Sequence, residues 1–307
     1  MKVFGLGPSH EIAETVCREL GLNLSIHTEE KFPDSELKTV TKESVQNSTV
    51  VVFASIAADK EKTLNDRLCE LYFFLCHLKD KGAAELTAVI PYFAYARSDQ
   101  RKKPDDPLTQ RYVAQLLELS GVDRVFVLDI HNIAAFENAF RCPAMNIEAA
   151  ELFCHYLSQT TNKNFSYVVM SPDIGGIKRA EKFRKIFSEQ CGLRVESAFL
   201  EKYRTADGLE GSHLVGEVRG KNIIIVDDMI STGATILRAV EACHKTECKS
   251  IKVLATHGLF VKNEDLLLNS NLIDEFIITN SYPLHLDLKK HKKLKVLSCA
   301  PLFSKIL

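Results

Sequence analysis

The sequence has no apolar run close to the roughly eighteen residues that cross a bilayer as a helix, so we expect no membrane partner. The beginning of the chain carries Glu11, Glu14 and Glu19 and lacks the basic-then-apolar order of an export signal. The cysteines include no CxxC pair, and their total of nine is odd. This spacing argues against metal knuckles and a disulfide framework, and reduced thiols in a cytoplasm fit it better.

An excess of basic residues is absent as well. The 39 Lys and Arg stand against 40 Asp and Glu, a formal net charge of −1, so the sequence predicts no general affinity for nucleic acid. Apolar residues form 46% of the chain and charged residues 26%, which is ordinary for a folded protein and too apolar for disorder. The length of 307 residues suggests two domains of about 150 residues, or one large domain.

Short β-branched runs alternate with helical stretches in each half of the sequence. The runs lack polar alternation, which is typical of parallel strands covered on both faces. They are Lys2–Gly7, Val50–Phe53, Thr87–Ile90 and Val125–Leu128, then Tyr167–Met170, Ile223–Val226, Ile251–Leu254 and Phe276–Thr279. The two series are offset by about 165–175 residues, which predicts an α/β fold made of a duplicated domain. One large α/β sheet is the alternative.

The segment after the run Ile223–Val226 carries the most chemistry. Two acids, Asp227 and Asp228, precede a short turn of small and hydroxyl residues that opens a helix, namely Ser231, Thr232, Gly233, Ala234 and Thr235. Backbone N–H groups at a helix N-terminus hold phosphate well, and the glycine allows close approach. Neighbouring carboxylates suit the vicinal hydroxyls of a sugar, so the pattern favours a ribose phosphate. A strand end with a capping hydroxyl is the structural alternative.

Further motifs support one family. The 223–235 segment resembles the ribose-phosphate loop of type I phosphoribosyltransferases and of ribose-phosphate pyrophosphokinases. The second family is favoured by motifs that recur in its order over nearly the whole chain: Phe32-Pro33-Asp34-Ser35-Glu36, Asn65-Asp66, Pro91–Arg97, Asp129-Ile130-His131, Ser171–Gly176, Thr256–Phe260, Thr279-Asn280 and Val296–Leu302.

The resemblance implies two tandem phosphoribosyltransferase-like (type I) domains, each a mostly parallel sheet flanked by helices. Residues 1–146 would form a first domain with a degenerate site that contributes ATP-binding segments. Residues 147–307 would form a second domain with the ribose 5-phosphate loop, and the C-terminal tail would pack on the first. The implied reaction converts ATP and ribose 5-phosphate to phosphoribosyl pyrophosphate and AMP. The implied assembly is a homo-oligomer, at least a dimer because the Phe32 loop serves a neighbour's site, with a hexamer among the sizes left open.

The resemblance also assigns roles to residues. Lys202 and Arg204 would be catalytic cations, next to a polar loop (205–212) that closes over the site. Asp129, His131 and Asp173 would bind Mg²⁺, which prefers oxygen ligands and borrows others from phosphates and water. The ATP-binding residues would be Phe32, Asp34, Ser35, Glu36, Arg97, Ser98, Asp99 and His131. The ribose 5-phosphate would be bound by 227–228 and 231–235. Apart from the resemblance, Lys178 and Arg179 in the first turns of the helix after Gly176 are expected to be solvated.

Some positions depart from the family pattern. Ser35 stands where the family has Gly, so we expect the turn to adopt positive φ less readily. Ser98 replaces a usual Gln, and 132–141 lacks the family's continuation after His131. These departures keep open a non-catalytic regulatory homologue of the same family. A phosphoribosyltransferase is a weaker alternative, because the ATP segments are retained.

The loop 101–107 leads to a prediction about regulation. Asp105 and Asp106 replace part of a Lys/Ser/Arg-rich segment that binds regulatory phosphate or ADP in many members of the family, and two acids should repel an anion there. We therefore expect phosphate activation and ADP allostery to be weak or absent. Activity measured at low and high phosphate checks this, and strong phosphate dependence would contradict it.

Overall fold

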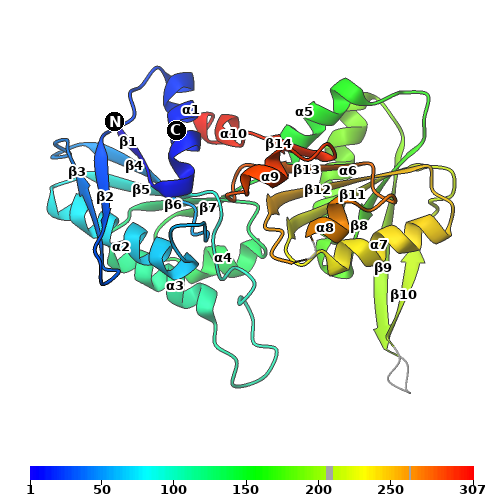
Figure 1. Ribbon diagram of the computed structural model, residues 1–307, viewed down its shortest axis with the longest axis horizontal. Helices are drawn as coiled ribbons and strands as arrows, with labels where there is room; N and C mark the ends of the chain where they lie inside the picture. The colour runs from blue at the N-terminus through cyan, green and yellow to red at the C-terminus, as the bar shows by residue number, and fades with distance from the viewer. Residues whose placement is uncertain (205–209, 263) are drawn as a thin grey trace. The chain divides into compact units, whose positions relative to one another are not determined.

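The computed structural model describes residues 1–204, 210–262 and 264–307, with the backbone alone at 202–204, 210, 264 and 286. The chain divides into two compact units (Figure 1). The first unit contains Met1–Glu148, Ser281–Pro283 and Ser298–Leu307, and the second unit contains Ala149–Asn280 and Leu284–Leu297.

The first unit is built on a five-stranded parallel sheet in the order β1-β4-β5-β6-β7. Its strands are β1 (Lys2–Gly5), β4 (Thr49–Phe53), β5 (Glu85–Ile90), β6 (Arg124–Leu128) and β7 (Ala144–Ile147). Its helices are η1 (Gly7–Ser9), α1 (His10–Leu20), α2 (Leu64–Asp80), α3 (Thr109–Leu119), α4 (Ile133–Ala139) and α10 (Ala300–Ser304). Figure 1 shows α1 on one side of the sheet and α2 and α3 on the other. Covering both faces explains why the central strands are continuous apolar runs.

A hairpin of β2 (His27–Lys31) and β3 (Leu37–Thr41) forms a separate two-stranded antiparallel sheet in the first unit. Glu29 lies opposite Thr39, and Glu30 lies opposite Lys38. Successive residues of a strand point to opposite faces, so the first pair faces inward and the second faces solvent. Thr39 is indeed buried, and the α2 helix packs against β3.

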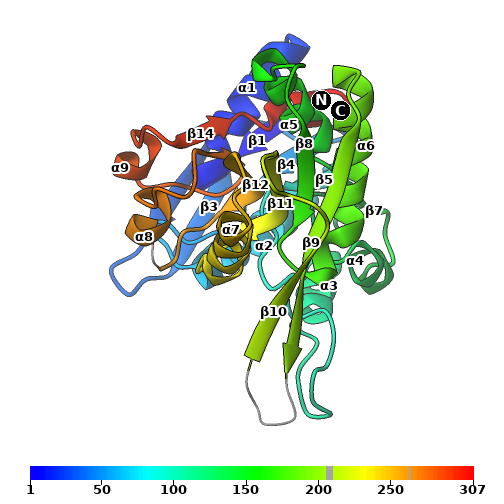
Figure 2. The same ribbon diagram turned by 90° about the vertical axis from the view of Figure 1, so that its right-hand side faces the viewer.

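The second unit is built on a seven-stranded sheet in the order β10-β9-β8-β11-β12-β13-β14, in which only the β9–β10 pair is antiparallel. Its strands are β8 (Tyr167–Ser171), β9 (Val195–Arg204), β10 (Glu210–Val215), β11 (Asn222–Ile230), β12 (Ser250–Gly258), β13 (Glu275–Thr279) and β14 (Leu294–Leu297). Its helices are α5 (Ala150–Thr160), η2 (Ile174–Gly176), α6 (Ile177–Cys191), α7 (Ala234–Lys245), α8 (Glu264–Leu268) and α9 (Leu286–Lys289). Figures 1 and 2 show α5 and α6 on one face and α7 on the other.

The two units follow the same order of elements. In each, a strand and a helix lead to a hairpin, and a second strand and helix lead to the rest of the sheet: β1, α1, β2–β3, β4, α2, β5 and β8, α6, β9–β10, β11, α7, β12. The hairpins differ in attachment, because β9 pairs with β8 whereas β2 and β3 pair only with each other. The predicted α/β fold with parallel sheets flanked by helices is confirmed. Each of the eight apolar runs coincides with all or part of a strand.

Helix ends follow their local sequences. The α1 helix is capped at its C-terminus by Gly21 and the α6 helix by Gly192, with φ of 68° and 64°, values that glycine adopts without strain.

All nine cysteines lie in the described ranges, and each is a free thiol. Within those ranges, no helix is both long enough and apolar enough to cross a membrane.

The start of α2 gives a testable prediction about stability. The Thr63 hydroxyl accepts a hydrogen bond from the Asp66 N–H at 3.2 Å, and the Thr63 N–H donates to the Asp66 carboxylate at 2.8 Å. Thr63→Ala should therefore lower the free energy of unfolding by about 1 kcal/mol. Thr63→Ser keeps the hydroxyl and should stay near the wild type. Urea unfolding of the two variants measures this, and an equal loss in both would contradict the capping role.

Candidate active site

The turn after β11 has the backbone geometry of an anion site. Gly233 has φ of 74°, and a Cβ at this position would lie only 2.1 Å from Cδ1 of Leu267. Both facts require glycine here. The twelve-residue helix α7 begins directly afterwards at Ala234. Its first N–H groups have no acceptor within the helix, so they are available to a phosphate next to Ser231 and Thr232.

The two acids lie inside β11 rather than after it. The predicted strand ends at Val226, but β11 continues to Ile230. The Asp228 N–H donates to Oδ1 of Asp227 at 2.9 Å. A guanidinium nitrogen of Arg179 lies 3.5 Å from Oδ1 of Asp228 and 3.7 Å from Oδ1 of Asp227. Arg179 was expected to be solvated, and this expectation was wrong, because the acid pair recruits it.

Burial and charge together disfavour the ionised form of Asp227. Burial raises the pKa of Asp227 well above its ordinary value, the neighbouring Asp228 raises it further, and Arg179 opposes the rise. A carboxylate offers two oxygens and several lone pairs, so a pair of adjacent acids can accept hydrogen bonds from more than one donor. Such a pair is suited to hydroxyl groups of a ligand, and perturbed acids of this kind concentrate at functional sites.

The turn that carries Asp173 ends at the same edge of the sheet. It follows β8, which pairs in parallel with β11 so that Met170 lies beside Ile225. Oδ1 of Asp173 accepts a hydrogen bond from the Gly176 N–H at 3.3 Å. A Cβ at Gly176 would lie 2.6 Å from the Ser171 hydroxyl, so only glycine allows this compact turn. The α6 helix then begins at Ile177 and carries Arg179 towards the acids.

The predicted catalytic cations lie on β9. In the backbone pairing with β10, Lys202 lies opposite Ser212 and Arg204 opposite Glu210. Figure 2 shows β9 and β10 extending beyond the other strands of the sheet. The side chains of Lys202 and Arg204 lie outside the described residues, as does the start of the predicted closing loop, 205–209.

The Phe32–Glu36 segment forms the turn of the β2–β3 hairpin. The Phe32 N–H donates to the Glu36 carbonyl at 2.9 Å, and the Ser35 N–H donates to the Phe32 carbonyl at 2.8 Å. The carboxylate of Asp34 accepts from the Glu36 N–H at 3.2 Å. Ser35 adopts φ of 75°, so the expected reluctance of serine does not prevent the turn. The ring of Phe32 is exposed.

The Arg97–Asp99 segment and the His131 segment follow neighbouring strands, β5 and β6. Oδ2 of Asp99 accepts from the Asn132 side-chain amide at 2.7 Å, which joins the two segments. The side-chain oxygen of Asn132 also caps α4. Arg97 and His131 are exposed, and Ser98 is half-buried. Asp129 is buried and has φ of 39°, a strained value of the kind that clusters at functional sites.

The residues predicted to bind a metal divide between the units. Asp129 and His131 belong to the first unit, and Asp173 belongs to the second. Among the residues that the structure describes, no group of three or more His, Cys, Asp or Glu residues is placed to hold a metal ion. The metal set therefore stays a prediction.

Comparison with known proteins identifies the family. Residues 1–121 match the N-terminal domain of ribose phosphate pyrophosphokinase, and residues 209–306 match the phosphoribosyl synthetase-associated domain. A ribose-phosphate pyrophosphokinase of Mycoplasmopsis pulmonis is 32% identical over 99% of this chain and 92% of its own length. One of Helicobacter hepaticus is 34% identical over 100% of this chain and 94% of its own. The crystal structure of phosphoribosylpyrophosphate synthetase from Mycobacterium smegmatis superposes with a TM-score of 0.88 at 32% identity, covering 99% of this chain and 96% of that one.

The chain belongs to the ribose-phosphate pyrophosphokinase family. As a family member it is an enzyme, with two phosphoribosyltransferase-like domains. Two residues to which the sequence analysis gave no functional role contact the predicted ones: Arg179 lies beside the acid pair, and Asn132 joins two ATP segments. Arg179 follows Gly176 by three residues at the start of a helix, a signal that could have drawn attention to it.

The raised pKa of Asp227 gives a testable prediction about the stability of the chain. An acid whose pKa rises on folding lowers stability once the unfolded chain ionises it, from about pH 4 upwards. Asp227→Asn removes this cost, so its melting temperature should exceed that of the wild type by a few degrees at pH 8, since about 1 kcal/mol shifts Tm by roughly 2–4 °C. The gain should shrink towards zero as the pH falls to about 4.

Thermal melts from pH 4 to pH 8 measure the difference. Asp265→Asn, at an exposed position in the same unit, is the matched control and should leave the melting temperature unchanged across the range. A gain for Asp227→Asn that does not vary with pH would refute the ionisation cost.

Proposed function

We propose that this chain is a ribose-phosphate diphosphokinase. It transfers the β,γ-diphosphoryl group of ATP to the anomeric hydroxyl of ribose 5-phosphate and releases phosphoribosyl pyrophosphate and AMP. The observation that carries this proposal is the match to ribose-phosphate pyrophosphokinases over nearly the full length of both chains. The geometry of the second unit supports it, because a phosphate-binding turn directly follows a pair of acids suited to sugar hydroxyls.

Ribose 5-phosphate binds at the carboxyl edge of β11 in this proposal. Its phosphate is held by the N–H groups and hydroxyls of 231–235 at the start of α7. Its vicinal hydroxyls donate to Asp227 and Asp228, and for Asp227 these hydrogen bonds offset part of the cost of burial. Arg179 keeps the acids oriented and limits their repulsion when no sugar is bound.

ATP is bound mainly by the first domain, residues 1–146. The exposed ring of Phe32 offers an apolar surface to adenine, and Asp34 and Glu36 offer acceptors to its exocyclic amine. Ser35 places these groups by closing the turn at positive φ. Arg97, Ser98, Asp99 and His131, on the segments that follow β5 and β6, bind ATP on the side of its phosphates.

Transfer of a diphosphoryl group needs positioning and neutralisation of charge more than covalent help. Lys202 and Arg204 supply fixed positive charge to the group in transit. Mg²⁺ is the proposed cofactor, because carboxylates such as Asp173 and Asp129 are the ligands it prefers, and phosphates and water complete its shell beside His131. When bound, the ion neutralises phosphate charge and orients the triphosphate.

The proposed enzyme is a homo-oligomer in the cytoplasm, where its thiols stay reduced. Each Phe32–Glu36 turn serves the site of a neighbouring subunit. A dimer is the smallest assembly that satisfies this arrangement, and a hexamer satisfies it as well.

The activity predicts the effect of one substitution. Purified protein with ATP, Mg²⁺ and ribose 5-phosphate should release AMP. Lys202→Ala should lower kcat by about 10²-fold or more, because it removes a charge that acts on the transition state. Binding of ATP, measured by calorimetry, should change far less.

Lys185→Ala is the matched control, since Lys185 lies on the same unit with its side chain 65% exposed. It should keep wild-type turnover. Absence of AMP from the wild type, with ATP still bound, would instead favour a non-catalytic regulatory homologue.

A further inference from the structure

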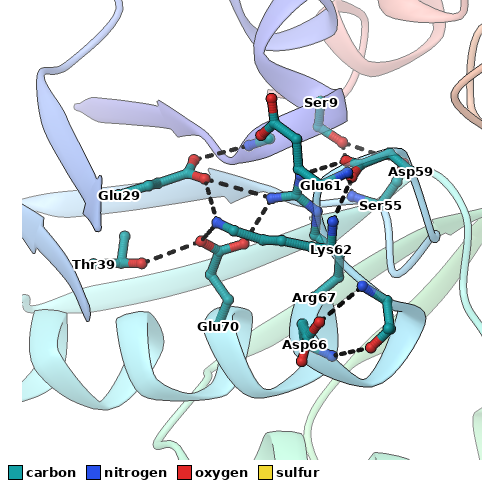
Figure 3. Close-up of polar contacts among 12 residues, drawn as sticks. Ser9, Glu29, Thr39, Ser55, Asp59, Glu61, Lys62, Asp66, Arg67 and Glu70 are labelled. Atoms are coloured by element: carbon teal, nitrogen blue, oxygen red, sulfur yellow. Dashed lines mark hydrogen bonds and ion pairs between the residues drawn. The ribbon is translucent and has the colours of Figure 1, made fainter. Parts of the chain in front are cut away.

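Five charged side chains form a cluster in the first unit, and three of them, Lys62, Arg67 and Glu70, are buried. We call this the ion cluster: Glu29, Asp59, Lys62, Arg67 and Glu70 (Figure 3). The side chains of Glu70, Arg67 and Lys62 are only 1%, 5% and 7% exposed. Charges buried this deeply persist only when they are paired and hydrogen-bonded.

Two cations join three acids within the ion cluster. Lys62 Nζ lies 2.5 Å from Oε1 of Glu70 and 2.9 Å from Oε2 of Glu29, and Figure 3 shows it extending between them. Arg67 Nη1 lies 2.8 Å from Oε2 of Glu70 and 3.4 Å from Oε2 of Glu29. The other terminal nitrogen of Arg67 pairs with Asp59. Each cation therefore bridges Glu29 to α2.

The ion cluster ties the hairpin to the edge of the main sheet. Glu29 lies on β2, and its Oε1 accepts a hydrogen bond from the Gly7 N–H at 2.9 Å, just after β1. Thr39, opposite Glu29 on β3, donates to Oε1 of Glu70 at 3.3 Å. Gly7 allows this close packing, because a Cβ there would lie 2.2 Å from Nη1 of Arg67.

The backbone joins this segment to the main sheet just before β2, where the Ser25 N–H donates to the Val3 carbonyl at 2.7 Å, and side chains hold the rest of the hairpin. The β2 and β3 strands are outside the five-stranded sheet. Near the start of β2, the Ile26 N–H donates to Glu43, which also pairs with Lys2. Towards the turn, Glu29 is the anchor, three residues before Phe32.

The charges of the ion cluster depend on one another. Burial alone would raise the pKa of Glu29, but hydrogen bonds from His27, Lys62 and the Gly7 N–H outweigh it and lower that pKa far below its ordinary value. Burial raises the pKa of Glu70. Glu29 is thus held as an anion, so its pairing with Lys62 and Arg67 is maintained over the range in which proteins are usually studied.

We propose that the ion cluster positions the Phe32–Glu36 turn for ATP, with Glu29, Lys62 and Glu70 as positioning residues that do not touch the nucleotide. This inference rests on the proposed function. In the second unit, the carboxyl edge of the sheet carries the predicted substrate turn. At the corresponding edge of its own sheet, the first unit has charged side chains that pair with one another and hold the hairpin in position. The hairpin then presents its aromatic tip in a fixed place.

Glu29→Gln tests this proposal, with Glu30→Gln as the matched control. The neighbouring Glu30 carries the same group on the opposite face of β2, paired at 3.5 Å with Lys38, and both side chains are more than half exposed. Glu29→Gln should raise KM for ATP by about tenfold or more while KM for ribose 5-phosphate stays within about twofold. Glu30→Gln should leave both constants near wild type.

A double-mutant cycle and hydrogen exchange separate positioning from general stability. Lys62→Met should raise KM for ATP as well, and adding it to Glu29→Gln should raise KM by less than the product of the single effects. Amide exchange should increase in 27–41 and not in β4–β6. If Glu29→Gln folds poorly, Thr39→Val replaces it, because this variant loses only the hydrogen bond to Glu70. We expect a smaller rise in KM for ATP and a smaller increase of amide exchange in 27–41.

Unchanged KM for ATP with unchanged exchange in 27–41 would overturn the proposal. An equal rise in both KM values, with faster exchange throughout the first unit, would overturn it too, because the ion cluster would then serve stability alone. Amide hydrogen exchange, and ATP binding measured by calorimetry, can both be followed without turnover of the enzyme. A wild type that binds ATP without forming AMP would therefore refute the proposed reaction and still leave the positioning role measurable.

Discussion

The carboxyl ends of β8 and β11 lie at the same edge of their sheet because the two strands pair in parallel, with Met170 beside Ile225. This pairing brings the turn of Asp173 next to the acids of β11, although more than fifty residues of chain separate them. Arg179 then becomes the shared partner of both acids. A glycine turn and a helix N-terminus follow directly. Change the register of this one strand pair, and the phosphate turn, the acids and Arg179 no longer meet.

The first unit repeats the same order of elements with a different outcome at the same edge. Where the second unit has two adjacent acids near one cation, Arg179, the first has two cations, Lys62 and Arg67, paired with three acids. Its charges therefore serve internal structure. A duplicated fold divided in this way can bind a sugar phosphate in one copy and present nucleotide-binding groups from the other.

Much of the fold could be predicted from the sequence, because continuous β-branched runs such as Ile223–Val226 leave few alternatives to buried parallel strands. The residue at which β11 ends could not be predicted from the sequence. Acids in a buried strand are unfavourable, so the sequence favours a loop at Asp227, but the parallel pairing with β12 continues β11 to Ile230.

The candidate site shows the same limit. Its turns could be predicted because glycine and hydroxyl residues are local signals, as at Gly233. Ser35 adopts positive φ although its residue type argues against it, since hydrogen bonds across the turn hold it there. The ion cluster left no local signal at all. Its members come from a strand, a loop and a helix, and a charge in a sequence does not reveal its partner.

The two hairpins differ in what holds them, and this difference bears on how the family can change. The β9 strand is locked to β8 by a backbone ladder, so any shift of the hairpin that carries Lys202 breaks several hydrogen bonds together. The β2–β3 hairpin has no such ladder to its sheet. A single side-chain replacement among the residues that hold it can therefore change its position, whereas the β9–β10 hairpin stays fixed by its backbone ladder.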